Sequence, residues 1–368
     1  MAHDCRNPIK VEQSRANISS RMESPKAKIV AASALLAILL LITAQSNAQH
    51  RQVPFQCRRL RDGMDLLPEI LENNLGTVGD PLNITDTAVF FHIPKAGGTS
   101  MKNLYGECYG MVLATGGAGR GHEHDDKLMI LPEYDRKFVN IETEDWEGIE
   151  NAKKLHFAQS GMVDVVFTMA FAPVAQIFSL DFQARYFTIF RHPIERAVSQ
   201  FYYLQDATWE ATYSPETKGW TVQQYAESHY ASDNWVVRQL VNKLDWQAEL
   251  YDEDLELAKD ILREKFVVGL ITKMEESKDR FDKYFGFGSE EDDSARDECV
   301  ARVLGLPSAK KEETQTTNSH PHPKVLPDTP EWEALMKVNT FDLELYDYAV
   351  ALFEEQAILF EGSEEDEA

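Results

Sequence analysis

The chain has 368 residues, of which 43% are hydrophobic and 10% are aromatic, so it is long and apolar enough to bury a sizeable core. Its formal net charge is −24, and this acidity excludes nucleic-acid binding through the average field of the protein. Any anionic ligand must therefore be held by a local group of basic side chains.

The N-terminus has the composition of a targeting signal. Residues 29–44 are apolar apart from Ser33 and Thr43, and basic residues precede them. Basic residues ahead of an apolar core predict that the N-terminus stays in the cytoplasm. We expect a cytoplasmic tail over residues 1–28 and a signal-anchor over residues 29–48, which attaches the protein to the membrane through one segment. A cleaved signal peptide that ends at Ala48 is the alternative.

Both interpretations place the rest of the chain in the lumen of the secretory pathway. There we expect a stem over residues 49–86, a catalytic domain over residues 87–360 and an acidic tail over residues 361–368. The sequon at Asn83 would be a glycosylation site in that compartment. At most one internal disulfide can form among the cysteines that follow the apolar segment, and the pairing stays open: Cys57, Cys108 and Cys299.

Short apolar runs alternate with helical patterns after residue 86. The runs with the character of buried strands are Thr87–Ile93, Arg185–Phe190 and Phe266–Ile271. Helical patterns cover residues 194–205, 221–244, 255–264, 275–285 and 331–360, whereas residues 111–126 and 308–330 resemble loops and residues 164–175 are ambiguous. Strands that alternate with helices predict an α/β fold with a central parallel sheet flanked by helices.

The first strand runs directly into the segment PKAGGTS, and a predicted helix follows it as far as Tyr109. A helix N-terminus offers free N–H groups and the positive end of the helix dipole to an anion. The glycines let the backbone approach an anion, the lysine adds a charge, and the hydroxyls add hydrogen-bond donors. The segment therefore predicts a phosphate site, with an ordinary turn and helix cap as the alternative: Lys95, Ala96, Gly97, Gly98, Thr99 and Ser100.

A second candidate anion site follows the second strand. Arg191 ends that strand, and Pro193 stands where a helix can begin. Ser199 lies about two helical turns beyond Arg191, so both side chains could face one anion. The alternative is that Arg191 and Arg196 pair with Glu195 or with other surface acids, and spacing alone leaves both possibilities open.

Together the two segments resemble the donor-binding motifs of sulfotransferases that use 3′-phosphoadenosine 5′-phosphosulfate (PAPS). HIPKAGGTS is similar to the 5′-phosphosulfate loop of the Golgi carbohydrate branch, which includes the heparan and chondroitin enzymes. RHPIERAVSQFYY resembles the 3′-phosphate segment, with His192 where aspartate is commoner. The resemblance extends from about Thr87 to Phe360. It includes an N-x-x-x-R-x-L pattern that begins at Asn234, and the later segments FVVGL and NTFDLELYDYA.

This resemblance implies a single sulfotransferase domain with a sheet like that of P-loop kinases. It implies PAPS as the donor and in-line transfer of the sulfuryl group, without a metal, to a hydroxyl of a glycan or polysaccharide. It also implies a single-pass type II protein of the Golgi membrane. The loop from Lys95 to Ser100 would bind the 5′ end of the donor, with Lys95 also acting in catalysis at the departing group. Arg191 and Ser199 would bind the 3′-phosphate.

The reaction also needs a base that takes the proton of the acceptor hydroxyl. The resemblance implies His156, because members of this branch have a catalytic histidine between the two phosphate motifs. Leu155 stands where a glycine is usual, which leaves the local backbone in doubt. His92, just before the first loop, is the rival candidate, and Glu107 is a weaker one.

Histidine-rich segments do not predict a metal site here. The run GHEHDD over residues 121–126 and the pair His320 and His322 each lack an evident third ligand. Other functions stay open: an ATP-dependent P-loop kinase, a sulfotransferase for tyrosine or a small molecule, and an inactive relative that binds PAPS or a glycan. The acceptor is not identified, and a neutral glycan stays open because no dense basic run is present.

Overall fold

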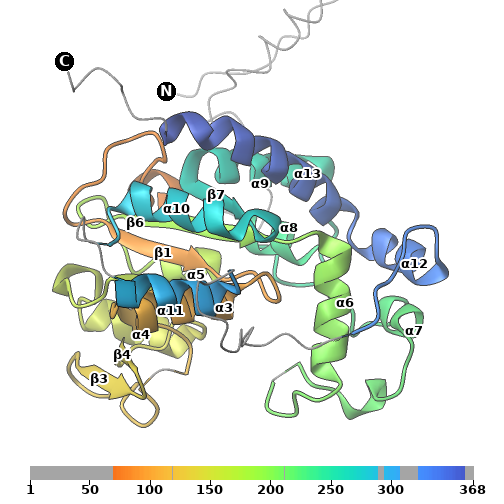
Figure 1. Ribbon diagram of the computed structural model, residues 1–368, viewed down its shortest axis with the longest axis horizontal. Helices are drawn as coiled ribbons and strands as arrows, with labels where there is room; N and C mark the ends of the chain where they lie inside the picture. Colours follow the sequence, from red (N-terminus) through yellow and green to blue (C-terminus); the bar gives the residue numbers. More distant parts are fainter. Residues whose placement is uncertain (1–68, 118, 211, 289–293, 307–321, 361–368) are drawn as a thin grey trace, which may run out of the picture. The chain divides into compact units, whose positions relative to one another are not determined.

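A seven-stranded sheet in the order β3-β4-β2-β5-β1-β6-β7 organises the chain (Figure 1). The computed structural model describes residues 69–117, 119–210, 212–288, 294–306 and 322–360, all within the unit Arg61–Ala368. β3 pairs antiparallel with β4, and the other pairs are parallel. The strands are β1 (Thr87–Phe91), β2 (Val112–Ala114), β3 (Ile130–Glu133), β4 (Arg136–Val139), β5 (Val165–Thr168), β6 (Ala184–Phe190) and β7 (Phe266–Leu270).

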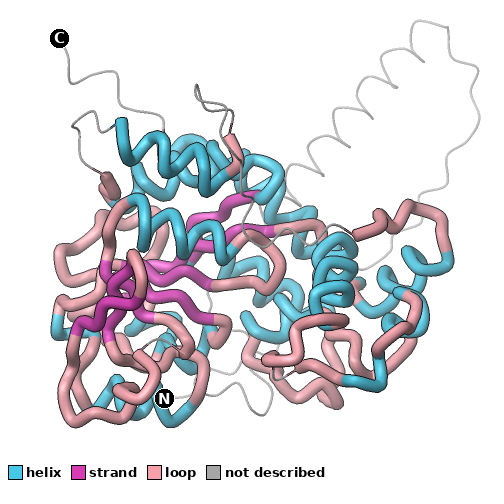
Figure 2. The backbone as a smooth tube through the Cα atoms, turned by 60° about the horizontal axis from the view of Figure 1, so that its bottom comes forward, coloured by secondary structure: helices cyan, strands magenta, loops and turns pink. Residues whose placement is uncertain are grey.

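Helices cover both faces of the sheet, and Figure 2 shows the strands in magenta between them. The predicted α/β class with a largely parallel central sheet is therefore confirmed. The α-helices are α3 (Gly98–Asn103), α4 (Trp146–Lys154), α5 (Phe171–Ala175), α6 (Pro193–Leu204), α7 (Val222–Ala226), α8 (Trp235–Leu240), α9 (Asp252–Lys265), α10 (Met274–Phe285), α11 (Ser294–Leu304), α12 (Pro330–Val338) and α13 (Thr340–Glu355). A π-helical segment, η3 (Leu104–Cys108), continues α3.

Alternate residues of the buried strands face opposite layers. On one face, Phe90 and Phe187 pack with ring centroids 5.1 Å apart, and α3, η3, α10 and α11 cover them. On the other face, Phe91 stacks on Trp235 of α8 at 5.8 Å and meets Phe171 of α5 at 6.1 Å. These aromatic contacts fix the layers around β1, the strand that carries the first loop.

Several predicted elements differ from the observed ones. β2 lies within residues 111–126, which we expected to be a loop, because three residues are too few to show a strand pattern. Residues 164–175 contain both β5 and α5, which explains their ambiguity. The predicted helix over residues 221–244 is divided into α7 and α8, and the one over residues 331–360 is interrupted at Asn339.

A disulfide joins Cys108 at the end of η3 to Cys299 on α11, which lies 191 positions further along the chain. This answers the pairing question for these cysteines, whereas Cys57 lies outside the described residues. The predicted anchor over residues 29–48 also lies outside them. Within the described ranges, no helix combines the length and the apolar character needed to cross a membrane.

Replacing both Cys108 and Cys299 with alanine should lower the free energy of unfolding by about 2–5 kcal/mol, because the cross-link constrains the unfolded chain. Urea denaturation monitored by tryptophan fluorescence measures this loss. A reducing agent should cause a similar loss in the wild type and none in the double variant. Equal stabilities of the oxidised wild type and the variant would contradict the structural role.

Candidate functional site

The two anion motifs meet at the carboxyl edge of the sheet. β1 pairs in parallel with β6, with Phe91 opposite Thr188, so both strands release the chain at the same edge. Nη1 of Arg191 donates a hydrogen bond to the carbonyl oxygen of Lys95 at 3.1 Å. The second loop therefore lies directly against the first, although Lys95 and Arg191 are 96 positions apart in the sequence.

Two positions of the first loop require glycine. Gly97 has φ = 91°, in the left-handed region, and a Cβ there would lie 2.7 Å from Cε of Met274. A Cβ on Gly98 would lie 2.0 Å from Cδ2 of His92, so the imidazole rests directly against the loop. Lys95 also has a left-handed backbone, with φ = 63°. The loop thus leaves the N-terminus of α3 open to an anion.

A cavity of about 710 Å³ opens over these loops and is within the usual size range of a small-molecule site. The predicted donor-binding residues that line it are Lys95, Gly97, Gly98, Thr99, Ser100, Arg191 and Ser199. Ala96 is buried beneath the loop and does not line the cavity. The structure therefore brings the two predicted anion sites into one cavity.

Lys95 reaches into this cavity over an aromatic ring. Its Nζ lies 3.9 Å from the ring centre of Tyr203, whose hydroxyl donates to Oε1 of Glu210 at 2.5 Å. Burial lowers the pKa of Lys95, the nearby Arg191 lowers it further, and Glu210 opposes both effects. Because the positive charges of Lys95 and Arg191 repel each other in the cavity, a bound anion would stabilise the charged forms of both side chains.

The alternative for the second motif is correct in part. Nε of Arg191 lies 3.5 Å from the largely exposed carboxylate of Glu195, a type of pair that contributes little. Arg196 is buried and lies 3.6 Å from Asp342. Arg191 is thus available to the cavity, whereas Arg196 has a structural role.

The candidate bases lie in different places. His92 lines the cavity, and burial together with Lys102 and Lys95 lowers its pKa to about 3, so its imidazole is neutral. His156 follows the end of α4, is exposed, has φ = 54°, and does not line the cavity. Glu107 lies on η3 beside Arg302 at 3.6 Å and does not line it either.

His192, the departure from the family pattern, also lies away from the cavity. Its ring stacks on Trp332 at 5.5 Å and meets Tyr346 edge-on at 5.4 Å. The substitution at this position therefore alters packing between α6, α12 and α13, and the Arg191 side chain remains in the cavity wall.

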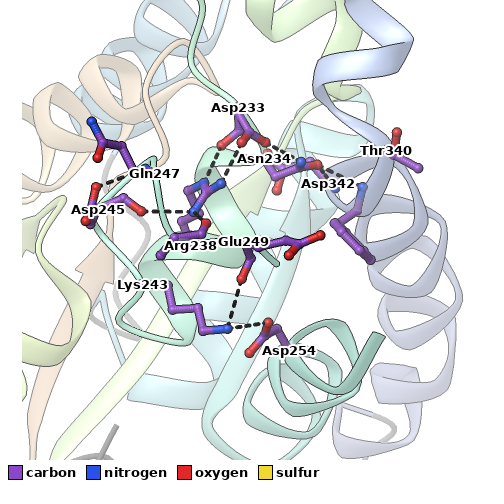
Figure 3. A network of polar contacts seen from close by, with 12 residues as sticks. Asp233, Asn234, Arg238, Lys243, Asp245, Gln247, Glu249, Asp254, Thr340 and Asp342 are labelled. Atoms are coloured by element: carbon purple, nitrogen blue, oxygen red, sulfur yellow. Dashed lines mark hydrogen bonds and ion pairs between the residues drawn. The ribbon is translucent and has the colours of Figure 1, made fainter. Parts of the chain in front are cut away.

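Two helices near the cavity cap each other (Figure 3). Oδ1 of Asn234 accepts hydrogen bonds from the backbone N–H groups of Phe341 and Asp342 at the start of α13, at 2.8 and 3.1 Å. The carboxylate of Asp342 accepts from Val236 and Val237 at the start of α8, at 3.1 and 2.9 Å. This exchange holds α8, whose Trp235 and Gln239 line the cavity.

Arg238 secures the chain that leaves α8, as Figure 3 also shows. Its Nη2 lies 2.6 Å from Oδ2 of Asp233, and its Nη1 donates to the carbonyl oxygens of Asp245 and Ala248 at 3.2 and 2.8 Å. The N-x-x-x-R-x-L pattern that begins at Asn234 thus has a structural role, because its Asn234 and Arg238 hold the ends of α8 in place beside the cavity.

The histidine-rich segments show no metal geometry. Nδ1 of His122 contacts Asp125 at 3.0 Å, and the ring of His322 stacks on Tyr202 at 5.1 Å, whereas His320 lies outside the described residues. Across the described ranges, no group of three or more His, Cys, Asp or Glu side chains is placed to hold a metal ion.

Several cavity residues are not among the predicted site residues. Tyr203 could have been found from helical spacing, because it follows Ser199 by one turn of α6, whereas Gln200 follows Ser199 directly and could not. Lys102 lies one turn into α3 after Gly98 in the same way. No local signal marks the rest, which come from distant loops, from strand ends and from α8: Glu144, Met169, Glu210, Thr212, Trp235, Gln239 and Ile271.

Replacing Asp342 with alanine should lower the free energy of unfolding by about 3–5 kcal/mol, because it leaves Arg196 buried and unpaired and uncaps α8. Glu344→Ala, at an exposed position of the same helix, should change it by less than about 0.5 kcal/mol. Chemical denaturation compares the two variants. Similar losses from both would contradict a specific role for the reciprocal caps.

Comparison with known proteins identifies the family of the chain. The model of the Sulfotransferase family matches residues 83–349, which is more than half of the chain. Among solved structures, mouse sulfotransferase SULT7A1 complexed with PAP is similar at 11% identity and a TM-score of 0.39, covering 80% of this chain and 94% of that chain. No curated protein sequence matches significantly. On the family match, the chain belongs to the Sulfotransferase family.

Proposed function

We propose that the protein transfers the sulfuryl group of PAPS to a hydroxyl of a glycan. The observation that carries this proposal is the convergence of two anion-binding loops in one cavity, where Arg191 contacts the backbone of Lys95 at 3.1 Å. A donor with phosphate at both ends of a nucleoside needs two such sites a short distance apart.

The residues present fit the donor. Gly97 and Gly98 leave the backbone uncovered at the start of α3, and Thr99 and Ser100 add hydroxyls on the cavity side, which suits a 5′-phosphosulfate. Arg191 and Ser199 line the same cavity from the second loop and α6, which suits a 3′-phosphate. When bound, PAPS supplies the sulfuryl group.

The reaction makes one bond and breaks one. The acceptor oxygen forms a bond to sulfur, the bond between sulfur and the phosphate oxygen breaks, and 3′-phosphoadenosine 5′-phosphate (PAP) leaves. Lys95 would stabilise the negative charge that develops on the leaving phosphate oxygen. A base must accept the proton of the acceptor hydroxyl.

We propose His92 as this base, in place of the sequence-based candidate His156. His92 lines the cavity and touches the loop at Gly98, and its imidazole is neutral, as a base requires. Burial is the largest cause of its low pKa, and Lys102 and Lys95 lower it further, so an anionic donor beside these lysines would raise the pKa and strengthen the base.

The lumen of the Golgi, behind an N-terminal membrane anchor, remains our proposed location. The disulfide between Cys108 and Cys299 supports an oxidising compartment, because such bonds are rare in the cytosol. Asn83 is exposed, which is compatible with glycosylation of its sequon.

PAP should bind the full-length chain, and Lys95→Ala and Arg191→Ala should each weaken that binding by about 10- to 100-fold, because each removes a charged hydrogen bond. Isothermal titration calorimetry gives the affinities. Lys259→Ala, which removes a cation paired with Glu256 outside the cavity, is the matched control and should change affinity less than about twofold. Binding of ATP and Mg²⁺ in place of PAP would instead indicate a kinase.

His92→Gln should lower kcat by about 10²–10⁴-fold, whereas His156→Gln should leave it nearly unchanged. Because the pKa of His92 is about 3 in the free protein and rises beside the anionic donor, the acid limb of kcat should lie at higher pH than that of kcat/KM for PAPS. His92→Gln should remove the acid limb of kcat. The opposite ranking of the two variants would restore His156, and PAP binding without any turnover would indicate an inactive relative.

A further inference from the structure

The sheet order separates the donor end of the cavity from the acceptor end. Arg191, which suits the 3′-phosphate, follows β6 on one side of β1. Met169 and Glu144 follow β5 and β4 on the other side of β1, and both line the cavity. An acceptor must reach the sulfuryl group from beyond the first loop, which is the side of Met169 and Glu144.

Two carboxylates line the cavity. Glu144 lies on the side of Met169, and Glu210, which follows α6, adds its negative charge to the surroundings of Glu144. Burial raises the pKa of Glu144, Lys102 opposes the rise, and Glu142 and Glu210 add to it, which is the behaviour of carboxylates that share a confined region. Residues 142–147 carry four carboxylates and no basic side chain, so the acidity continues along this segment.

Lys102 is the cation of the cavity on this side, and it is already engaged. Its Nζ donates to Oγ1 of Thr115 at 2.7 Å, and it lies close enough to Glu144 to lower the pKa of that carboxyl. It therefore offsets part of the acidity on this side of the cavity, and part of its own charge is already balanced by Glu144 when a polyanionic acceptor arrives.

An exposed tryptophan stands beside each acidic segment. Trp146, two residues after Glu144, is 57% exposed, and Trp209, next to Glu210, is 73% exposed. Trp209 meets Tyr203 of the cavity edge-on, with ring centroids 6.4 Å apart. Large exposed aromatic rings mark binding surfaces, and the C–H face of a sugar ring packs well on them.

We propose that the acceptor is an uncharged polysaccharide, an inference that rests on the proposed sulfotransferase function. Carboxylates at Glu144 and Glu210 accept hydrogen bonds from sugar hydroxyls, and Trp209 offers an apolar surface to the ring. A uronate or sulfate group at the same place meets like charge in a confined cavity, which lowers its affinity.

The test uses the full-length chain, labelled PAPS and matched pairs of polymers. Each pair consists of a neutral glucan, mannan, galactan or xylan and the same polymer oxidised to carry carboxylates, with de-N-acetylated chitin as a cationic polymer. We expect at least one neutral polymer to be sulfated with a kcat/KM about tenfold or more above that of its oxidised form. Higher kcat/KM for the oxidised or the cationic polymers would overturn the inference.

Variants connect the preference to the carboxylates. Glu144→Lys should reduce the ratio of neutral to oxidised turnover at least about threefold, and the milder Glu144→Gln should reduce it less. Glu344→Lys makes the same change of charge at an exposed position of α13 and should leave the ratio unchanged. An unchanged ratio in both Glu144 variants would contradict the role of this carboxylate.

PAP affinity, measured on the same preparations, distinguishes a wrong acceptor class from a wrong proposed function. A wild-type chain that binds PAP but sulfates no polysaccharide retains the donor site and overturns the proposed acceptor class. A folded chain that does not bind PAP overturns the proposed function and, with it, this inference.

Discussion

The parallel pairing of β1 with β6 is the constraint on which the site depends. Parallel neighbours release the chain at the same edge of a sheet, so Lys95 and Arg191 come together although their segments are far apart in sequence. The aromatic layers on both faces hold these strands in register, and this fixes the positions of the loops that follow them. A cavity with two anion sites is thus a consequence of strand order before it is a consequence of any single side chain.

The electrostatics of the cavity reverse those of the whole chain. A protein with a net charge of −24 places Lys95, Lys102 and Arg191 around one cavity. Burial lowers the pKa of both lysines, repulsion from Arg191 lowers that of Lys95 further, and repulsion from Arg136 lowers that of Lys102 further. Burial, with a smaller effect of Lys102 and Lys95, keeps His92 neutral. An anionic ligand would relieve this repulsion, so the binding energy arises from strain among the cations as well as from hydrogen bonds.

The two loops of the cavity could be recognised in the sequence because each is formed by a local segment. PKAGGTS follows one buried strand, and Arg191 and Ser199 flank one helix start, so sequence alone indicated both sites and the α/β class. Glu144 and Glu210 come from separate loops and Trp235 comes from α8, and only the folded sheet brings them to the cavity. The position of His156 was inferred from resemblance at a point where Leu155 breaks the pattern, and that segment lies outside the cavity. Motifs within one segment could be predicted from the sequence, whereas the meeting of distant residues in one cavity could be seen only in the tertiary fold.

The mutual capping of Asn234 and Asp342 has a consequence for how the protein is made. The two residues are 108 positions apart, and Asp342 lies near the end of the family-matched region. While the chain is being synthesised, the start of α8 lacks its cap until α13 has emerged. The wall that holds Trp235 and Gln239 can therefore settle only after α13 has been made, and a nascent chain arrested before α13 would carry the loops at Lys95 and Arg191 without this wall.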